Sequence, residues 1–233
     1  MKKNLPFFLA LYGVVGFLEI ASIVAEKELL RQGFKILCIP LLALYFWNAT
    51  AGVDVRHRRN GLLALGFSYA GDLFLLPTET PFGLFLAGLL SFLIAHLVYI
   101  RLFTDFVAVR GGYVWKRPLW LVVAASYYAI VLWTLLPGIE TGLRIPVVMY
   151  GMTICSMALA ALNTFEEKRA LASQLLLAGA ILFVLSDTLL AIRTFIPANG
   201  QSAVLKAAVM ATYLSGQFLL VQGLRLRLTS KSN

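Results

Sequence analysis

The sequence predicts an all-α integral membrane protein with eight transmembrane helices and both termini in the cytoplasm. Of its 233 residues, 60% are hydrophobic and 13% are charged, and the mean hydropathy is +0.84. Soluble globular domains contain about 25% charged residues and 45–50% apolar ones. The composition therefore excludes a soluble domain, and the apolar residues suffice for seven or eight spans of about 20 residues each.

The apolar residues form continuous runs that short polar segments separate, whereas the strands of a transmembrane β-barrel would alternate. Each run is long enough for a spanning helix, which satisfies its own backbone hydrogen bonds in lipid. The runs that we interpret as helices are 5–24, 33–51, 60–76, 82–104, 117–137, 144–163, 172–193 and 203–224. Together they predict a single polytopic membrane domain over residues 1–233.

The first run follows Lys2 and Lys3 and so resembles a signal peptide. Glu19 interrupts it and no small-residue cleavage site follows, so we interpret the run as the first helix. Pro40 and Pro146 lie near the starts of the second and sixth helices, where a proline can kink a helix. Five further prolines mark the ends of runs: Pro77, Pro81, Pro118, Pro137 and Pro197.

The positions of Lys and Arg predict the orientation. The amino terminus, the second, fourth and sixth loops and the carboxyl terminus hold 14 of the 20 basic residues, and the opposite side holds 6. By the positive-inside rule both termini are cytoplasmic, and we expect a bacterial cytoplasmic membrane. Because the net charge of +9 arises from these loop clusters, we expect no nucleic-acid partner.

A weak internal repeat is the remaining feature of the organisation. An offset of 115 residues aligns Asp72 with Asp187, and each lies late in its run. A parallel four-plus-four repeat would give the third and seventh helices the same orientation. The alignment contains few identities, so chance explains it nearly as well.

Ionisable residues within the runs are the candidates for function, because each costs roughly 2.5–3.5 kcal/mol at a helix centre. With the amino terminus inside, the acids fall late in outward helices and the lysines early in inward helices, which places them in the outer half of the membrane. Arg101, Arg144 and Arg193 lie near helix ends, where we expect them to snorkel. The candidates are Glu19, Lys35, Asp72, His96, Asp187 and Lys206.

Polar neighbours at helical spacing extend these positions into stripes. Ser68 precedes Asp72 by four residues, and Tyr99 follows His96 by three. In the eighth helix, Lys206, Tyr213 and Gln217 share one face. A single stripe of this kind often only joins helices, but several stripes at one depth indicate a shared cavity.

Several chemistries have no sequence support. The chain has two histidines, too few for a three-histidine zinc site, and Cys38 and Cys155 lie inside apolar runs. It has neither a G-x-S-x-G elbow nor a phosphate-binding P-loop. We therefore expect no metal and no cofactor.

Four stretches of the sequence carry the polar positions in a recognisable order. They are Gly66-Phe-Ser-Tyr-Ala-Gly-Asp72-Leu-Phe-Leu, Phe82-Gly-Leu-Phe-Leu-Ala-Gly88 with Phe92, His96 and Tyr99, Leu182-Phe-Val-Leu-Ser186-Asp187-Thr-Leu-Leu-Ala, and Thr212-Tyr213 with Gln217. Together with Lys35 they resemble the YhhN-like membrane family, and the resemblance runs from about Lys35 to Gln217. The family includes the lysoplasmalogenases, which hydrolyse the vinyl ether bond of lysoplasmalogens to a fatty aldehyde and a glycerophospho-alcohol. The resemblance implies a lysophospholipid substrate within the bilayer.

This chemistry needs a proton donor for the alkene and a negative group that stabilises the resulting cation or activates water. We assign both roles to Asp72 and Asp187 as a pair that holds one proton. Lys35 would meet the phosphate of the substrate. The other residues expected to bind substrate or to orient the pair are Glu19, Ser68, His96, Tyr99, Ser186, Tyr213 and Gln217.

Two other functions remain open at this point. A small proton-coupled secondary transporter would use the same intramembrane aspartates as a proton relay. A non-catalytic lipid-binding or scaffold protein would need those acids only for helix packing. The sequence does not decide whether the chain forms a homo-oligomer.

Overall fold

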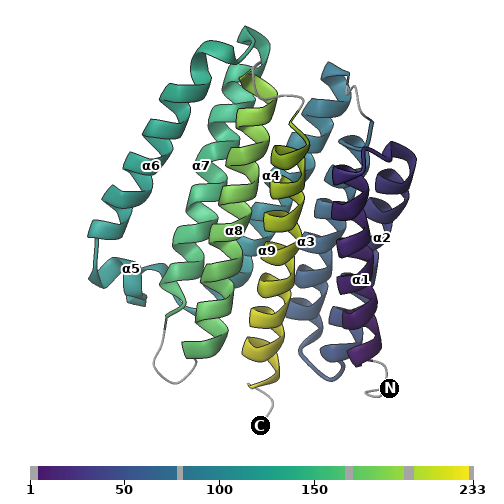
Figure 1. Cartoon of the computed structure of the whole chain (residues 1–233). Helices are drawn as coiled ribbons and strands as arrows, with labels where there is room; N and C mark the ends of the chain where they lie inside the picture. Colours follow the sequence, from purple (N-terminus) through teal and green to yellow (C-terminus); the bar gives the residue numbers. More distant parts are fainter. Residues whose placement is uncertain (1–4, 78–80, 166–169, 197–201, 231–233) are drawn as a thin grey trace.

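The structure is a computed structural model that describes residues 5–77, 81–165, 170–196 and 202–230, and these residues form helices and no strand (Figure 1). The all-α prediction is therefore confirmed for the described residues. Lys2, Lys3, Pro197 and the loop residues 78–80 lie outside them. The long helices are α1 (Leu5–Val24), α2 (Glu28–Ala49), α3 (Val55–Phe74), α4 (Phe82–Phe106), α6 (Leu119–Leu135), α7 (Thr141–Asn163), α8 (Ala170–Phe195) and α9 (Ala203–Thr229).

Seven of these helices in the described part of the chain are long and apolar enough to cross a membrane. The chain is thus an integral membrane protein with several spanning helices. Helix α3 is the exception, because its first turn carries Arg56, Arg58 and Arg59 and its last turn carries Asp72. The predicted count of eight spans therefore depends on α3, a 20-residue helix that packs between α2 and α4.

The helix ends differ from the apolar runs in a consistent way. Helices α2 and α3 begin five residues before the predicted starts at 33 and 60, and α9 continues past 224 to Thr229. The additional turns are charged, and Asp54 caps α3 by accepting a hydrogen bond of 3.1 Å from the backbone N–H of His57. Apolar runs mark the part of a helix that faces hydrocarbon, whereas hydrogen bonding continues into the polar boundary of the bilayer.

Seven of the helices form a closed ring. In the order α1, α2, α3, α4, α7, α8 and α9, each packs against the next, and α9 packs back against α1. The first turn of α1 and the last turn of α9 lie at the same end of the bundle (Figure 1). Buried side chains from all seven helices form one hydrophobic core inside the ring.

Helix α6 lies outside the ring, against α7 and α8 (Figure 1). Of its 17 residues, only Leu135 is buried. Its outward side chains include Ile130 and Trp133, which are 67% and 83% exposed. Large apolar side chains at such exposure indicate a surface that faces lipid. The short helices α5 (Tyr113–Lys116) and η3 (Leu136–Gly138) lie on either side of α6 in the chain.

Glycines allow α8 and α9 to approach closely. A Cβ atom at Gly179 would lie 2.7 Å from the backbone nitrogen of Leu220 and 2.8 Å from the carbonyl oxygen of Gly216. Small residues at such crossings let helix backbones pack together in a membrane. This contact fixes the relative positions of the two helices that supply half of the residues around the interior cavity.

Candidate active site

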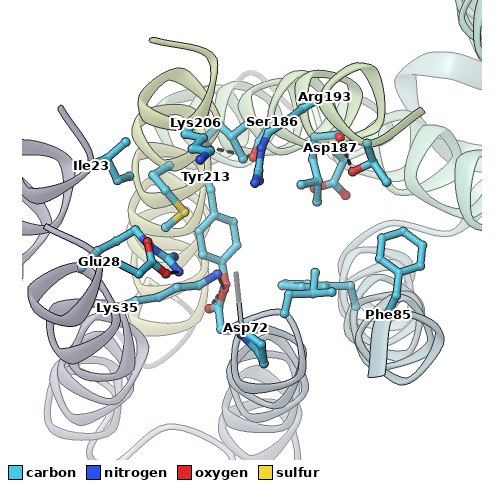
Figure 2. A pocket seen from close by; sticks show the side chains of 18 residues that line it. Ile23, Glu28, Lys35, Asp72, Phe85, Ser186, Asp187, Arg193, Lys206 and Tyr213 are labelled. Atoms are coloured by element: carbon cyan, nitrogen blue, oxygen red, sulfur yellow. Dashed lines mark hydrogen bonds and ion pairs between the residues drawn. The ribbon is translucent and has the colours of Figure 1, made fainter. Parts of the chain in front are cut away.

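A cavity of about 300 Å³ lies inside the ring, and Figure 2 shows the side chains that line it. Its wall includes Ile23 near the end of α1 and Lys206 near the start of α9, so the cavity lies at the end opposite the first turn of α1 and the last turn of α9. Helices α1, α2, α3, α4, α8 and α9 all contribute to its wall. Its charged and polar lining residues are Glu28, Arg31, Lys35, Asp72, Ser186, Asp187, Arg193, Thr194, Lys206 and Tyr213.

Asp72 is held from two helices. The hydroxyl of Tyr213 on α9 donates a hydrogen bond of 2.7 Å to Oδ2 of Asp72, and Nζ of Lys35 on α2 lies 3.5 Å from Oδ1. Asp72 is 4% exposed and Lys35 is 8% exposed. A buried carboxylate is stable when a cation and a hydrogen-bond donor compensate it. These two contacts therefore stabilise the ionised form of Asp72 against the cost of its burial.

A chain of hydrogen bonds continues from Asp72 into the bundle. The amide nitrogen of Gln217 donates to the Tyr213 hydroxyl over 3.5 Å, and the Tyr99 hydroxyl donates to the amide oxygen of Gln217 over 3.0 Å. Tyr99 and Gln217 are fully buried. The network thus orients Tyr213 toward Asp72, and it joins five of the residues that the sequence singles out.

Asp187 has a different environment. It lies on α8, and the hydroxyl of Tyr150 on α7 donates a hydrogen bond to its Oδ2. No salt bridge links Asp187 to a cation among the described residues. Since an unpaired carboxylate is costly away from water, this environment favours the protonated form.

The structure brings Asp72 and Asp187 to one cavity, but not into contact. Figure 2 shows them on different sides of the cavity, Asp72 on α3 and Asp187 on α8. Two carboxyl groups that share a proton would be hydrogen-bonded to each other. Within the described residues, each is bonded to its own tyrosine instead. The direct pair that we expected from the sequence is thus replaced by two acids with separate partners.

Three of the predicted residues lie behind the cavity wall. His96 is fully buried, and its ring packs against Tyr150 and Phe183 at centroid distances of 5.4 and 4.8 Å. The two ring nitrogens of His96 have no hydrogen-bond partner among the described residues, and the Ser68 hydroxyl has none there either. Glu19 is fully buried and accepts a hydrogen bond of 3.4 Å from the thiol of Cys38. None of the three lines the cavity, so the structure gives them no direct contact with a ligand there.

The structure also gives the positions of two other basic residues. Lys35, which we expected to meet phosphate, is paired with Asp72. Arg193, which we expected to snorkel, lines the cavity with Lys206. Ser186 also lines the cavity, and its hydroxyl donates to the carbonyl oxygen of Val209 over 3.0 Å.

A second, apolar cavity of about 70 Å³ lies between α6, α7 and α8. Asp187 lines both cavities, and Tyr150 lines the second. Val131, Leu132 and Ile154 are among the apolar residues of its wall. Asp187 therefore lies where a polar chamber meets an apolar groove beside α6.

Sequence reasoning missed Tyr150, Glu28 and Arg31. Tyr150 is a polar residue within an apolar run, which is the signal that could have identified it. Glu28 and Arg31 precede the apolar run at 33–51, so a search restricted to the runs omitted them. Arg31 Nε donates to Glu28 Oε2 over 2.9 Å, and Nη2 donates to the carbonyl oxygen of Leu76 over 3.0 Å. No group of three or more His, Cys, Asp or Glu residues in the described parts of the chain could hold a metal ion.

Comparisons with known proteins agree with the sequence resemblance. The model of the YhhN family matches residues 30–224. The chain is 30% identical over 190 residues to a Sus scrofa protein named lysoplasmalogenase TMEM86B, a match that covers 81% of this chain and 73% of the relative. No solved structure matches the chain.

Proposed function

The chain belongs to the YhhN family, and from that premise we propose that it is an intramembrane hydrolase that cleaves the vinyl ether bond of lysoplasmalogens. The products would be a fatty aldehyde and a glycerophospho-alcohol. The observation that carries the proposal is that two acids line one cavity and differ in their partners. The buried Asp72 is paired with a cation, whereas the half-buried Asp187 is paired with none among the described residues.

The two cavities suit a lipid with one chain. The larger cavity holds the charged side chains and lies at one end of the bundle, and the smaller one is apolar and lies beside the lipid-exposed helix α6. A lysophospholipid could therefore place its head in the first and its hydrocarbon chain in the second. Its vinyl ether would then lie beside Asp187, the residue common to both walls. The exposed position of α6 supports entry of the lipid from the side.

Asp187 is the proposed general acid. Its proton goes to the outer alkene carbon, where the electron pair of the double bond forms the new C–H bond. The positive charge is then shared by the inner carbon and the ether oxygen as an oxocarbenium ion. Proton donation by a positioned side chain contributes about 10²–10⁴-fold to rate. Tyr150 holds the carboxyl group in position for this transfer.

Asp72 is the proposed base. Its carboxylate stabilises the oxocarbenium ion and takes a proton from the water that adds to the inner carbon. The resulting hemiacetal then loses its hydroxyl proton to Asp187, while the glycerol oxygen leaves with the proton from Asp72. This step breaks the C–O bond, releases aldehyde and alcohol, and returns both aspartates to their starting states.

The proposed orientation places the chemistry in the outer half of the membrane. With α3 as the eighth span and both termini cytoplasmic, the cavity opens toward the non-cytoplasmic side. The split of basic residues, 14 against 6, supports this orientation, and we propose a bacterial cytoplasmic membrane as its location. A four-plus-four repeat is compatible with the positions of Asp72 and Asp187 late in α3 and α8.

The direct test is aldehyde release by the purified full-length protein. Lysoplasmenylcholine and lysoplasmenylethanolamine serve as substrates, and the saturated 1-O-alkyl analogue serves as the control without a vinyl ether. We expect aldehyde from the first two and none from the third. Absence of aldehyde from both vinyl ethers, with the protein folded, would refute the proposed activity.

A further inference from the structure

We infer that the mouth of the larger cavity is a phosphate-binding subsite, formed by Arg31, Arg193 and Lys206. Their side chains come from three helices, α2, α8 and α9, and all three line the cavity. The identification of the phosphate as that of a lysophospholipid rests on the proposed function. The subsite takes the place of Lys35, which is 8% exposed and is paired with Asp72, the proposed base.

Basic residues at this end of the bundle gather on the cavity. The predicted outer side of the chain carries six of them: Lys27, Arg31, Lys35, Arg144, Arg193 and Lys206. Four line the cavity, and only Lys27 and Arg144 do not. A general surface charge would leave these side chains distributed around the rim. Their convergence on one chamber indicates an anionic ligand.

The described residues of the cavity wall carry more basic than acidic side chains. Four are basic, Arg31, Lys35, Arg193 and Lys206, and three are acidic, Glu28, Asp72 and Asp187. Arg31 pairs with Glu28, and Lys35 pairs with Asp72. With Asp187 protonated, as proposed above, the described wall has an excess of two positive charges. A ligand with a single negative charge is therefore attracted to the mouth, and two guanidinium groups suit the oxygens of a phosphate.

Part of this subsite is already fixed in position. Glu28 and the carbonyl oxygen of Leu76 hold the guanidinium group of Arg31. Because the side chain is ordered before a ligand arrives, binding costs less conformational entropy. The bond to Leu76 also attaches α2 to the end of α3, the helix that carries Asp72.

The distance from the mouth to the acid matches the substrate. Arg193 follows Asp187 by six residues on α8, which corresponds to a rise of about 9 Å along the helix. In a lysoplasmalogen, seven bonds separate the outer alkene carbon from phosphorus, a span of about 8 Å at roughly 1.2 Å per bond in an extended chain. A phosphate held at Arg193 would thus place the vinyl ether beside Asp187.

The test compares two vinyl ethers with the same chain, lysoplasmenylcholine and the phosphate-free 1-O-alk-1′-enylglycerol, on the purified full-length protein. We expect Arg193→Gln and Lys206→Met each to raise KM for the phospholipid about tenfold, since a hydrogen bond to a charged group is lost. KM for the phosphate-free substrate should not change. Arg144→Gln and Lys27→Met, which remove charges at the same end but outside the cavity, should change neither KM.

A binding measurement separates this inference from the proposed function. Thermal stabilisation of the wild type and Arg193→Gln is recorded with 1-O-hexadecyl-glycerophosphocholine, with 1-O-hexadecylglycerol and with inorganic phosphate. We expect stabilisation of the wild type by the ether phospholipid, and a loss of that stabilisation in Arg193→Gln. This result supports the subsite even if no vinyl ether is cleaved, whereas the absence of cleavage would refute only the hydrolase.

Two results would overturn the inference. The first is an equal effect of Arg193→Gln and Lys206→Met on ligands with and without phosphate, which would make their role structural. The second is equal stabilisation by inorganic phosphate alone and by the ether phospholipid, which would show that the mouth of the cavity binds a free anion and not a phospholipid head group.

Discussion

The hydroxyl of Tyr213 lies 2.7 Å from Oδ2 of Asp72 and donates a hydrogen bond to it, although 141 positions separate the two residues in the chain. The contact joins α9 to α3 across the interior of the ring. It gives Asp72 a fixed orientation toward the cavity, and with Lys35 it favours the carboxylate form. The division of labour proposed for the two acids depends on this contact.

Replacing Tyr213 by Phe removes that hydrogen bond and the 3.5 Å bond from the Gln217 amide, and it keeps the aromatic ring. We expect Tyr213→Phe to lower kcat about tenfold, because a hydrogen bond to a charged group contributes about 1.5–3 kcal/mol. The matched control is Tyr12→Phe, since the buried Tyr12 hydroxyl donates a bond of the same length to the carbonyl oxygen of Leu214. Steady-state aldehyde release measures both. Equal kcat in the two variants would contradict a specific role for Tyr213.

The ion pair between Lys35 and Asp72 leads to a prediction that separates two roles for Lys35. If Lys35 bound phosphate, as the sequence suggested, its loss would raise KM. Because it is paired with Asp72, we expect Lys35→Met to lower kcat with little change in KM. Lys27→Met, at an exposed lysine next to the same helix, is the control. An increase in KM at unchanged kcat would contradict this prediction and would indicate that Lys35 binds the substrate phosphate.

The crossing of α8 and α9 gives a prediction on stability. We expect Gly179→Ala to lower the free energy of unfolding by about 1–3 kcal/mol, because the new methyl group would contact the backbone of α9. Gly13→Ala is the control, since a Cβ atom there meets nothing within 4 Å. Thermal unfolding in detergent compares the two. A Gly179→Ala protein as stable as Gly13→Ala would show that the crossing has room for a side chain.

The orientation in the membrane is tested with reporter fusions. A reporter after Asn233 and one inserted within 77–81 should report opposite sides of the membrane, the first cytoplasmic. The physical reason is the excess of Lys and Arg in the loops on the side of the termini. The eight-span topology places five membrane crossings, α4, α6, α7, α8 and α9, between residue 81 and the carboxyl terminus. Reporters on the same side would show that this part of the chain crosses the membrane an even number of times, which contradicts that topology.

Much of the fold could be predicted because the bilayer imposes a simple rule on the sequence. A continuous apolar run must form a helix in lipid, so composition alone indicated where helices lie. The rule does not predict the charged turns that extend a helix beyond its apolar run, and for this reason the sequence analysis missed Glu28 and Arg31. It also gives no pairing of helices, so neither the seven-helix ring nor the external position of α6 could be foreseen.

The site could be predicted only in part, for a related reason. The cost of burying charge identified Asp72, Asp187 and Lys35 as candidates. That cost does not tell which group compensates each charge. Which cation or tyrosine compensates each acid depends on helix packing. The sequence therefore suggested a shared proton between Asp72 and Asp187, whereas the structure gives each acid its own tyrosine. His96 was a candidate because burying an ionisable side chain is costly, and it lies among aromatic rings behind the cavity wall.

Tyr150 provides a test of the environment of Asp187. Tyr150→Phe should lower kcat about tenfold, because the proposed acid loses the group that positions it. The matched control is Tyr45→Phe, since the Tyr45 hydroxyl donates to the side-chain oxygen of Gln222 and Tyr45 lines neither cavity. Wild-type kcat in Tyr150→Phe would show that Asp187 needs no such support.

The central claim is that Asp187 and Asp72 act as acid and base, and the most direct measurement is aldehyde release from lysoplasmenylcholine by the purified Asp187→Asn and Asp72→Asn variants. Asp105→Asn is the control, since Asp105 is paired with Arg56 and Arg101 away from the cavity. We predict a loss of at least about a hundredfold in kcat for each of the first two variants, as expected for acid–base groups, and near wild-type turnover for the control. A folded Asp187→Asn protein that releases aldehyde at the wild-type rate would contradict the account.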